Sequence, residues 1–361
     1  MRIRFFNPGL TFQKDKDEYN KEINRVLTNG DVILREDVER FEKELAAIVG
    51  TKYAIGLNSG TDALFLSLKA LGVGIGDEVI TVSHTFVATI EAIVHNGATP
   101  ILIDVKQDGL MDVEQIIPAI TEKTKAIIPV HLEGNYCDMI KILNIAEEYG
   151  LFVIEDSAQA LGAKIDGMVG AGSVGAAGCF SFYPAKILGS FGDAGALTTN
   201  NDWLAQEIRK LRNHYNIKGS EVDVKYGFNM RLDNLQAAIL NVRIKRLPEI
   251  LKRREEIAMM YNDGLISPLI VKPKIKVGRV WQDYVIRTKH RKELKECLDK
   301  NEIETLGANL IPNHKYLGLG LDFDLPVTEQ IYTEQLRLPC NDNLTVEEVD
   351  YVIEKVNQFF K

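Results

Sequence analysis

Short apolar runs alternate with longer stretches of helical spacing along most of the chain. The runs are four or five residues long and occupy residues 53–57, 78–82, 100–103, 126–130, 151–154, 179–182 and 195–198. Because most of them are separated by enough residues for a crossover helix, the pattern predicts an α/β fold with a mainly parallel sheet sandwiched by helices. The last two runs lie close together, so we expect a departure from strict alternation between 178 and 199.

Several helices can be predicted from the same pattern. The apolar residues within 36–49 recur at helical spacing, which predicts a helix that ends at Gly50. The residues before this helix are expected to be irregular. Another helix is expected from 201 to about 212. A long helical stretch from 231 to 263 has Pro248 inside it, where we expect an interruption.

The helical pattern breaks near residue 264, where prolines and a glycine follow in short order. Beyond this point the chain predicts a strand at 281–288 and helices at 289–301 and 345–360. We therefore expect a large domain over residues 1–263 and a smaller C-terminal α+β domain over residues 264–361.

The composition is that of an ordinary soluble globular protein. The chain has 361 residues, of which 45% are hydrophobic and 26% charged, and its formal net charge is -8. This charge argues against a nucleic-acid partner, and the lack of a long apolar run argues against a membrane partner, so we expect a cytoplasmic protein. The four cysteines are scattered without a paired spacing, so neither a metal site nor a disulfide framework is expected.

Lys186 lies in the most unusual stretch of the sequence. It follows an apolar run and Tyr183-Pro184, and Gly189 and Gly192 lie three and six residues after it. Glycines permit turns and close backbone approach, so this lysine is expected close to the backbone in partly apolar surroundings. Desolvation would lower its pKa, and a neutral amine can form a Schiff base with a carbonyl. The alternative is a surface lysine that extends its charge into water.

Asp156 ends an apolar run, where an unpaired carboxylate is costly to bury. Lys186 lies beyond the next predicted strand, so both side chains could reach one pocket. Either the two form an ion pair, or a ligand lies between them.

Residues 57–64 read as a strand, a turn of small residues and a helix start. The amides of Gly60, Thr61 and Asp62 could therefore bind a phosphate, because the first N–H groups of a helix lack internal partners. The alternative is that Ser59, Thr61 or Asp62 is only an N-cap. After the next strand, Phe86 or His84 could lie flat against an aromatic ligand, although Phe86 could equally fill the core.

Six motifs in order closely resemble the DegT/StrS family of sugar aminotransferases. They are G-T-D-A-L, S-H-T-F-V-A-T, E-D-S-A-Q-A-L-G-A, S-F-Y-P-A-K-x-L-G, G-D-A-G-A and G-F-N-M-R-L-D-N-L-Q-A-A-I-L, and the similarity weakens after residue 264. The resemblance implies the fold of aspartate aminotransferase, which is fold type I of the pyridoxal 5'-phosphate (PLP) enzymes. It also implies PLP as the cofactor and a homodimer with shared active sites.

The resemblance assigns roles to individual residues. Lys186 would form the Schiff base with PLP and move the proton during catalysis, and Asp156 would pair with the pyridinium nitrogen. Gln159 would lie near the ring oxygen and Phe86 would stack on the ring. The phosphate would be bound by Gly60, Thr61, Ser181 and, from the second subunit, Asn229.

The substrate contacts are less defined. The polar loop 213–229 carries His214 and Lys218, which could bind a nucleotide diphosphate or simply be solvated. Tyr215 stands where the family often has glycine, which puts these contacts in question. His131, in V-H-L, resembles members that aminate C3 of the sugar, but it could also be a core histidine. Tyr183 and Arg231 complete the candidate substrate-binding set.

The implied reaction is a ping-pong transamination from glutamate to a ketone on a nucleotide-linked sugar. We expect a 3-keto-6-deoxy or related hexose linked to dTDP or UDP, and an amino sugar for a surface polysaccharide such as the O-antigen of lipopolysaccharide. One alternative is amination at C4. Another is a regulatory protein that binds PLP without turnover. A nicotinamide dehydrogenase is disfavoured because the first strand is not followed by the glycine fingerprint.

Overall fold

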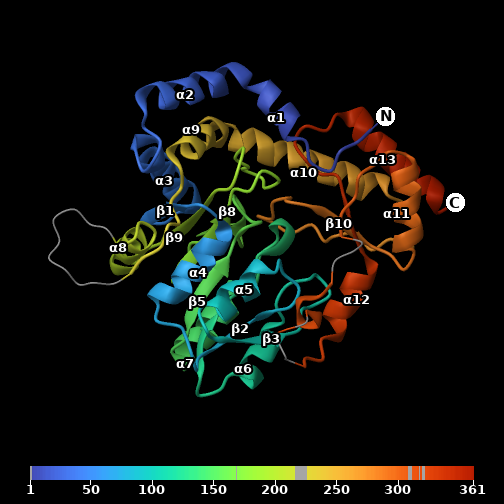
Figure 1. Ribbon diagram of the computed structural model, residues 1–361. Helices are drawn as coiled ribbons and strands as arrows, with labels where there is room; N and C mark the ends of the chain where they lie inside the picture. The colour runs from blue at the N-terminus through green and yellow to red at the C-terminus, as the bar shows by residue number, and fades with distance from the viewer. Residues whose placement is uncertain (1, 168, 216–225, 308–310, 317, 319–321) are drawn as a thin grey trace.

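A seven-stranded sheet forms the centre of the protein (Figure 1). The computed structural model describes residues 2–167, 169–215, 226–307, 311–316, 318 and 322–361. The strand order is β1-β9-β8-β5-β4-β2-β3, and the predicted mainly parallel sheet is confirmed. The strands are β1 (Tyr53–Leu57), β2 (Glu78–Val82), β3 (Thr99–Ile103), β4 (Thr124–Ile127), β5 (Phe152–Asp156), β8 (Ala177–Ser181) and β9 (Gly195–Thr199).

β9 is the exception to the parallel arrangement. It pairs antiparallel with both of its neighbours, β1 and β8, whereas the remaining pairs are parallel. The departure expected between 178 and 199 is therefore confirmed. A short hairpin of β6 (Lys164–Ile165) and β7 (Val169–Gly170) precedes β8.

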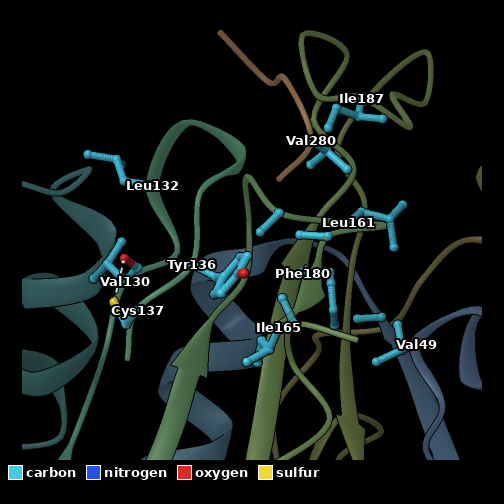
Figure 2. Packing of buried hydrophobic residues seen from close by; sticks show 14 of the residues in the cluster. Val49, Val130, Leu132, Tyr136, Cys137, Leu161, Ile165, Phe180, Ile187 and Val280 are labelled. Carbon is cyan, nitrogen blue, oxygen red and sulfur yellow. Dashed lines mark hydrogen bonds between the residues drawn. The ribbon is translucent and has the colours of Figure 1, made fainter. Parts of the chain in front are cut away.

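Helices cover both faces of the sheet and create two cores. Successive strand residues point to opposite faces, so Phe180 lies in the first core and Cys179 in the second. Figure 2 shows part of the first core, where Phe180 lies near Val49 and Ile165. The first core is covered by α3 (Glu36–Val49), α6 (Ile116–Ala119), α7 (Met139–Tyr149) and α9 (Asn234–Arg243), and the second by α4 (Gly60–Ala70), α5 (Ala88–His95) and α8 (Asp202–Leu211).

The expectation of an irregular N-terminal segment is wrong. Two helices, α1 (Pro8–Lys14) and α2 (Lys16–Asn29), lie over α9. Asn7 caps α1 by accepting a hydrogen bond from the amide of residue 10. Only Tyr19 and Val26 of α2 are buried, so this helix lacks the wide apolar stripe that reveals a core helix in a sequence.

The C-terminal part builds a third core around a two-stranded antiparallel sheet. β10 (Tyr284–Arg287) pairs with β11 (Gln335–Leu338), and the sheet packs on α11 (Arg291–Lys300) and α13 (Val346–Phe359), while α12 (Pro326–Glu334) leads into β11. The helical stretch before it breaks at Ile244–Arg246, and Pro248 lies in the first turn of α10 (Leu247–Gly264). Ile257 and Tyr261 of α10 belong to this core, and the division at residue 264 stays a prediction.

Candidate active site

A cavity of about 510 Å³ lies at the carboxyl ends of β2, β4, β5 and β8. In an open α/β sheet this edge is where ligands bind. The cavity brings together nine of the residues proposed from the sequence. They are Gly60, Thr61, Phe86, His131, Asp156, Gln159, Ser181, Tyr183 and Lys186.

Lys186 lies in a tight turn after β8. Its amide donates to the carbonyl of Tyr183 at 2.8 Å, and a Cβ on Gly189 would lie 2.3 Å from the carbonyl oxygen of Pro184. The crowded backbone expected from the glycines is therefore present. Burial lowers the pKa of the Lys186 ammonium, and the charges of Asp283 and Asp156 oppose part of this effect. Among the described residues its Nζ has no hydrogen-bond or ion-pair partner, so the amine is available.

Asp156 ends β5 with a side chain that is only 6% exposed. Its Oδ2 accepts a hydrogen bond from the Thr89 hydroxyl at 2.7 Å, and its Oδ1 accepts from the Ala158 amide at 3.2 Å. These two donors fix the orientation of the carboxylate. Within the described part of the chain, Asp156 and Lys186 form no ion pair although both line the cavity. This arrangement fits the alternative in which a ligand lies between them.

The start of α4 forms one end of the cavity. Ser59 is the N-cap, because its hydroxyl accepts from the Asp62 amide at 3.0 Å, so the expectation that this amide binds a phosphate is wrong. The amides of Gly60 and Thr61 belong to the first turn and have no acceptor within the helix. Gly195 permits the close approach of β9, since a Cβ there would lie 2.2 Å from the Ser59 carbonyl carbon.

The Asp62 carboxyl lies in the same first helical turn as these amides. Burial raises its pKa to about 6, against the opposing hydrogen bond from Ser59. Burial therefore disfavours the charged form of this carboxyl. The two amide donors at the helix terminus suit a phosphate group.

Phe86 and Gln159 line the middle of the cavity. Phe86 is 69% exposed, which is unusual for a large aromatic side chain and fits stacking on a flat ligand rather than filling the core. Gln159 Oε1 accepts from the Glu133 amide at 2.8 Å, which leaves its Nε2 as a donor for a ring oxygen. The Ser181 hydroxyl accepts from the Tyr183 amide at 3.3 Å and keeps its own proton to donate.

His131 contributes only a wall to the cavity. The side chain is fully buried, its Nε2 bonds to Glu155 at 3.0 Å, and its Nδ1 accepts from the Cys137 amide at 3.2 Å. Since both ring nitrogens are occupied, no polar atom remains for a substrate. The core-histidine alternative fits this geometry, and a substrate-facing role of His131 stays a prediction.

Three other proposed residues lie outside this cavity, and one lies outside the described residues. The His214 amide donates to the Phe228 carbonyl. Arg231 Nη1 donates to Asn213 Oδ1 at 2.9 Å, and the segments that carry these residues pair beside β1. Asn229 and His214 are exposed. Lys218 is the residue outside the described part. The described residues of this loop therefore do not line the cavity of their own chain.

Gln282 is a residue near the site that the sequence did not reveal. Its Oε1 accepts from the Ile187 amide at 3.0 Å and its Nε2 donates to the Ala185 carbonyl at 2.9 Å. The buried side chain thus clamps the backbone on both sides of Lys186. Arg254 holds the clamp in place by donating to the Gln282 carbonyl at 3.0 Å. No local pattern could signal this contact, because Gln282 is more than ninety residues away.

Replacing Gln282 with leucine should leave the buried Ile187 amide unpaired, which costs roughly 1–3 kcal/mol, and should also free the partly buried Ala185 carbonyl. We expect the turn to loosen, with kcat reduced about 10–100-fold by misplacement of the Lys186 amine and KM for the amino donor little changed. Steady-state kinetics and the pH at which the bound cofactor changes its visible absorbance would measure this. Gln330→Leu, on the exposed face of α12, is the matched control. An unchanged absorbance titration in Gln282→Leu would contradict the positioning role.

A profile of the DegT/DnrJ/EryC1/StrS aminotransferase family matches residues 13–357. The chain belongs to this family. Among the described residues of this aminotransferase, no cluster of three or more metal-ligating side chains could hold a metal ion, and no helix is long and apolar enough to cross a bilayer.

Curated relatives match the aminotransferase over nearly its whole length. A dTDP-3-amino-3,6-dideoxy-alpha-D-galactopyranose transaminase of Aneurinibacillus thermoaerophilus is 42% identical and covers 98% of this chain and 99% of its own. A "pleiotropic regulatory protein" of Geobacillus stearothermophilus is 39% identical, with coverages of 100% and 99%. A UDP-N-acetyl-3-dehydro-alpha-D-glucosamine 3-aminotransferase of Acidithiobacillus ferrooxidans is 38% identical, with coverages of 92% and 91%.

Solved structures show the same fold as this aminotransferase. DesV of S. venezuelae has a TM-score of 0.95 at 36% identity and covers 100% of this chain and 99% of its own. NtdA of Bacillus subtilis, solved with bound PMP, the amino form of PLP, has a TM-score of 0.92 at 31% identity, with coverages of 99% and 85%. The predicted family, fold and cofactor are confirmed, and the protein is a PLP-dependent sugar aminotransferase.

Proposed function

We propose that this aminotransferase moves the amino group of glutamate to C3 of a keto sugar linked to dTDP or UDP. The observation that carries the proposal is the single cavity that combines the Lys186 amine, the Asp156 carboxylate and the free amides at the start of α4. The choice of C3 and of these nucleotides is supported by relatives named for 3-amino sugars on dTDP and on UDP. A 3-keto-6-deoxyhexose is the substrate we favour, and the product is an amino sugar for a surface polysaccharide.

Each cavity residue has a task in this proposal. PLP supplies an electron sink for the charge that develops at the reacting carbon. Lys186 would hold the aldehyde carbon of PLP and move a proton at the donor carbon, because its amine is desolvated and unpartnered. Asp156, oriented by Thr89, would keep the ring nitrogen protonated. The amides of Gly60 and Thr61 together with Ser181 would bind the phosphate.

The remaining cavity residues would orient the ring. Phe86 would stack on one face, and the Gln159 Nε2 donor would meet the ring oxygen. Tyr183 is 52% exposed at the cavity and is the proposed contact to the sugar.

The function can be tested with a panel of keto nucleotide sugars and glutamate. The panel contains 3-keto and 4-keto sugars on dTDP, UDP and GDP, and the readouts are 2-oxoglutarate formation and NMR of the product. We expect turnover with a 3-keto sugar on dTDP or UDP. An amine at C4 would favour the alternative keto position. A cofactor absorbance that glutamate does not change would favour the regulatory reading.

We also propose a homodimer in which Asn229 of one subunit completes the phosphate site of the other. The support is that Asn229, His214 and Arg231 lie outside the chain's own cavity. Lys218, from the same loop, is proposed to contact the substrate in this arrangement.

Mixing two inactive variants tests this arrangement. Lys186→Ala and Asn229→Ala impair residues that would belong to opposite subunits of one site, so a mixed dimer should contain one intact site. We expect activity to recover toward about a quarter of wild type after subunit exchange, if exchange is random. No recovery despite exchange, or an active monomer by light scattering, would contradict the shared site.

A further inference from the structure

A second cavity, of about 460 Å³, lies between the β10–β11 sheet and the large sheet. It shares no lining residue with the cofactor cavity. One face of β10–β11 carries Leu336 and Leu338 into the third core, so the alternate residues Arg287 and Gln335 point the other way and line this cleft. Its opposite wall is formed by the loops at 107–109 and 133–135.

Positive charge dominates the lining of the cleft. None of its cationic side chains forms an ion pair with a carboxylate within the described part of the chain. Instead they donate to neutral oxygens, as Lys276 does to the Tyr136 carbonyl at 3.0 Å and Arg279 to the Lys274 carbonyl at 3.1 Å. The five cations are Lys272, Lys274, Lys276, Arg279 and Arg287.

The two carboxylates of the lining do not balance these charges. Glu133 Oε1 faces Arg337 at 3.8 Å, and Asp108 Oδ1 accepts from the Leu110 amide at 3.2 Å. Burial lowers the pKa of both Lys276 and Arg279, with nearby acidic groups opposing only part of the effect. This positive region belongs to a chain whose net charge is -8.

Gln335 provides an independent observation. The side chain is fully buried beside His84, and neither the Gln335 amide atoms nor His84 Nε2 has a hydrogen-bond partner of normal geometry among the described residues. An unpaired buried amide costs free energy that a bound polar ligand can recover. Since Gln335 lines the cleft, its unpaired polar atoms and the cations that lack a carboxylate partner lie at the same place.

We infer that this cleft binds a multivalent oxoanion, with phosphate or carboxylate groups, at a site separate from the cofactor cavity. The cations supply charge and several N–H donors, and the Gln335 amide supplies a neutral donor. A monovalent ion would leave most of the positive lining unmatched, whereas a pyrophosphate-sized group would reach several donors at once.

The test is isothermal titration calorimetry on the PLP-saturated enzyme, in which the phosphate site of the cofactor is already filled. Inorganic pyrophosphate is the phosphate probe and citrate is the carboxylate probe, each at low and at high sodium chloride. We expect saturable binding that weakens as salt rises. The tighter of the two probes identifies the chemistry, and binding of neither would overturn the inference.

Variants locate the binding. Lys274→Ala/Arg287→Ala should weaken binding of the better probe at least about tenfold, since two charge-assisted contacts are lost. Gln335→Leu should weaken it less, because a neutral donor is removed. Lys43→Ala, on the exposed face of α3, is the matched control and should leave binding unchanged. Equal affinity in the double variant and in wild type would place the anion elsewhere and overturn the inference.

Discussion

Lys186→Ala is expected to abolish transamination. Proton transfer by a placed base typically contributes about 10²–10⁴-fold to a rate, and loss of the nucleophilic amine adds to this. The turn that carries Lys186 is held by backbone contacts and by Gln282, so the variant should fold normally. The measurement is 2-oxoglutarate formation from glutamate, with circular dichroism to check the fold.

Borohydride reduction locates the modified lysine independently of activity. The reduced cofactor should be attached to Lys186 in a peptide map of the wild type and should be missing from the Lys186→Ala protein. Lys69→Ala, on the exposed side of α4, is the matched control and should keep both the adduct and the rate. An adduct on any other lysine would refute the assignment of this catalytic residue.

Asp156→Asn should produce the second-largest loss. Asparagine keeps the size of the side chain and can still accept from Thr89, but it cannot balance a positive ring nitrogen in this buried place. Removing one partner of a buried ion pair costs about 3–5 kcal/mol, which corresponds to a loss of about 10²–10⁴-fold in rate. Steady-state kcat and the affinity for PLP would measure it.

Thr89→Val provides a graded comparison for Asp156→Asn. It removes the 2.7 Å hydrogen bond that orients the carboxylate but leaves the charge in place. We expect a loss of about 10–100-fold, in line with the roughly 1.5–3 kcal/mol of one hydrogen bond to a charged group. If Asp156→Asn retained nearly the wild-type rate, or lost less than Thr89→Val, Asp156 would not be the partner of the ring nitrogen.

Local sequence patterns predicted the strands of the sheet well and the N-terminal helices poorly. All seven apolar runs are strands in the structure, and their ends lie within three residues of those predicted. The runs are recognisable because each strand packs against an apolar core on both of its faces. The N-terminal helices were missed because α2 buries only two side chains and is otherwise polar. The break after α9 lies at Ile244–Arg246, just before Pro248, because proline is accommodated in the first turn of a helix.

The cofactor cavity could be anticipated to a large extent, since its residues follow strand ends that a parallel sheet brings to one edge. The details depend on which partner each side chain takes. His131 lines the cavity, but Glu155 and the Cys137 amide occupy both of its ring nitrogens. The Asp62 amide was expected to be free, but the Ser59 hydroxyl occupies it. Neither preference is encoded in the spacing of residues along the chain.

The sequence by itself determined the order of strands and helices, the crowded setting of Lys186 and the position of Asp156 at a strand end. Periodicity, glycine spacing and the cost of a buried carboxylate are local properties, so they can be read from neighbouring residues. Only the tertiary structure decided that Gln282 clamps the Lys186 turn and that five cations meet the unpaired Gln335 in a second cleft. Those contacts join segments far apart in the chain, and packing of the whole molecule selects them.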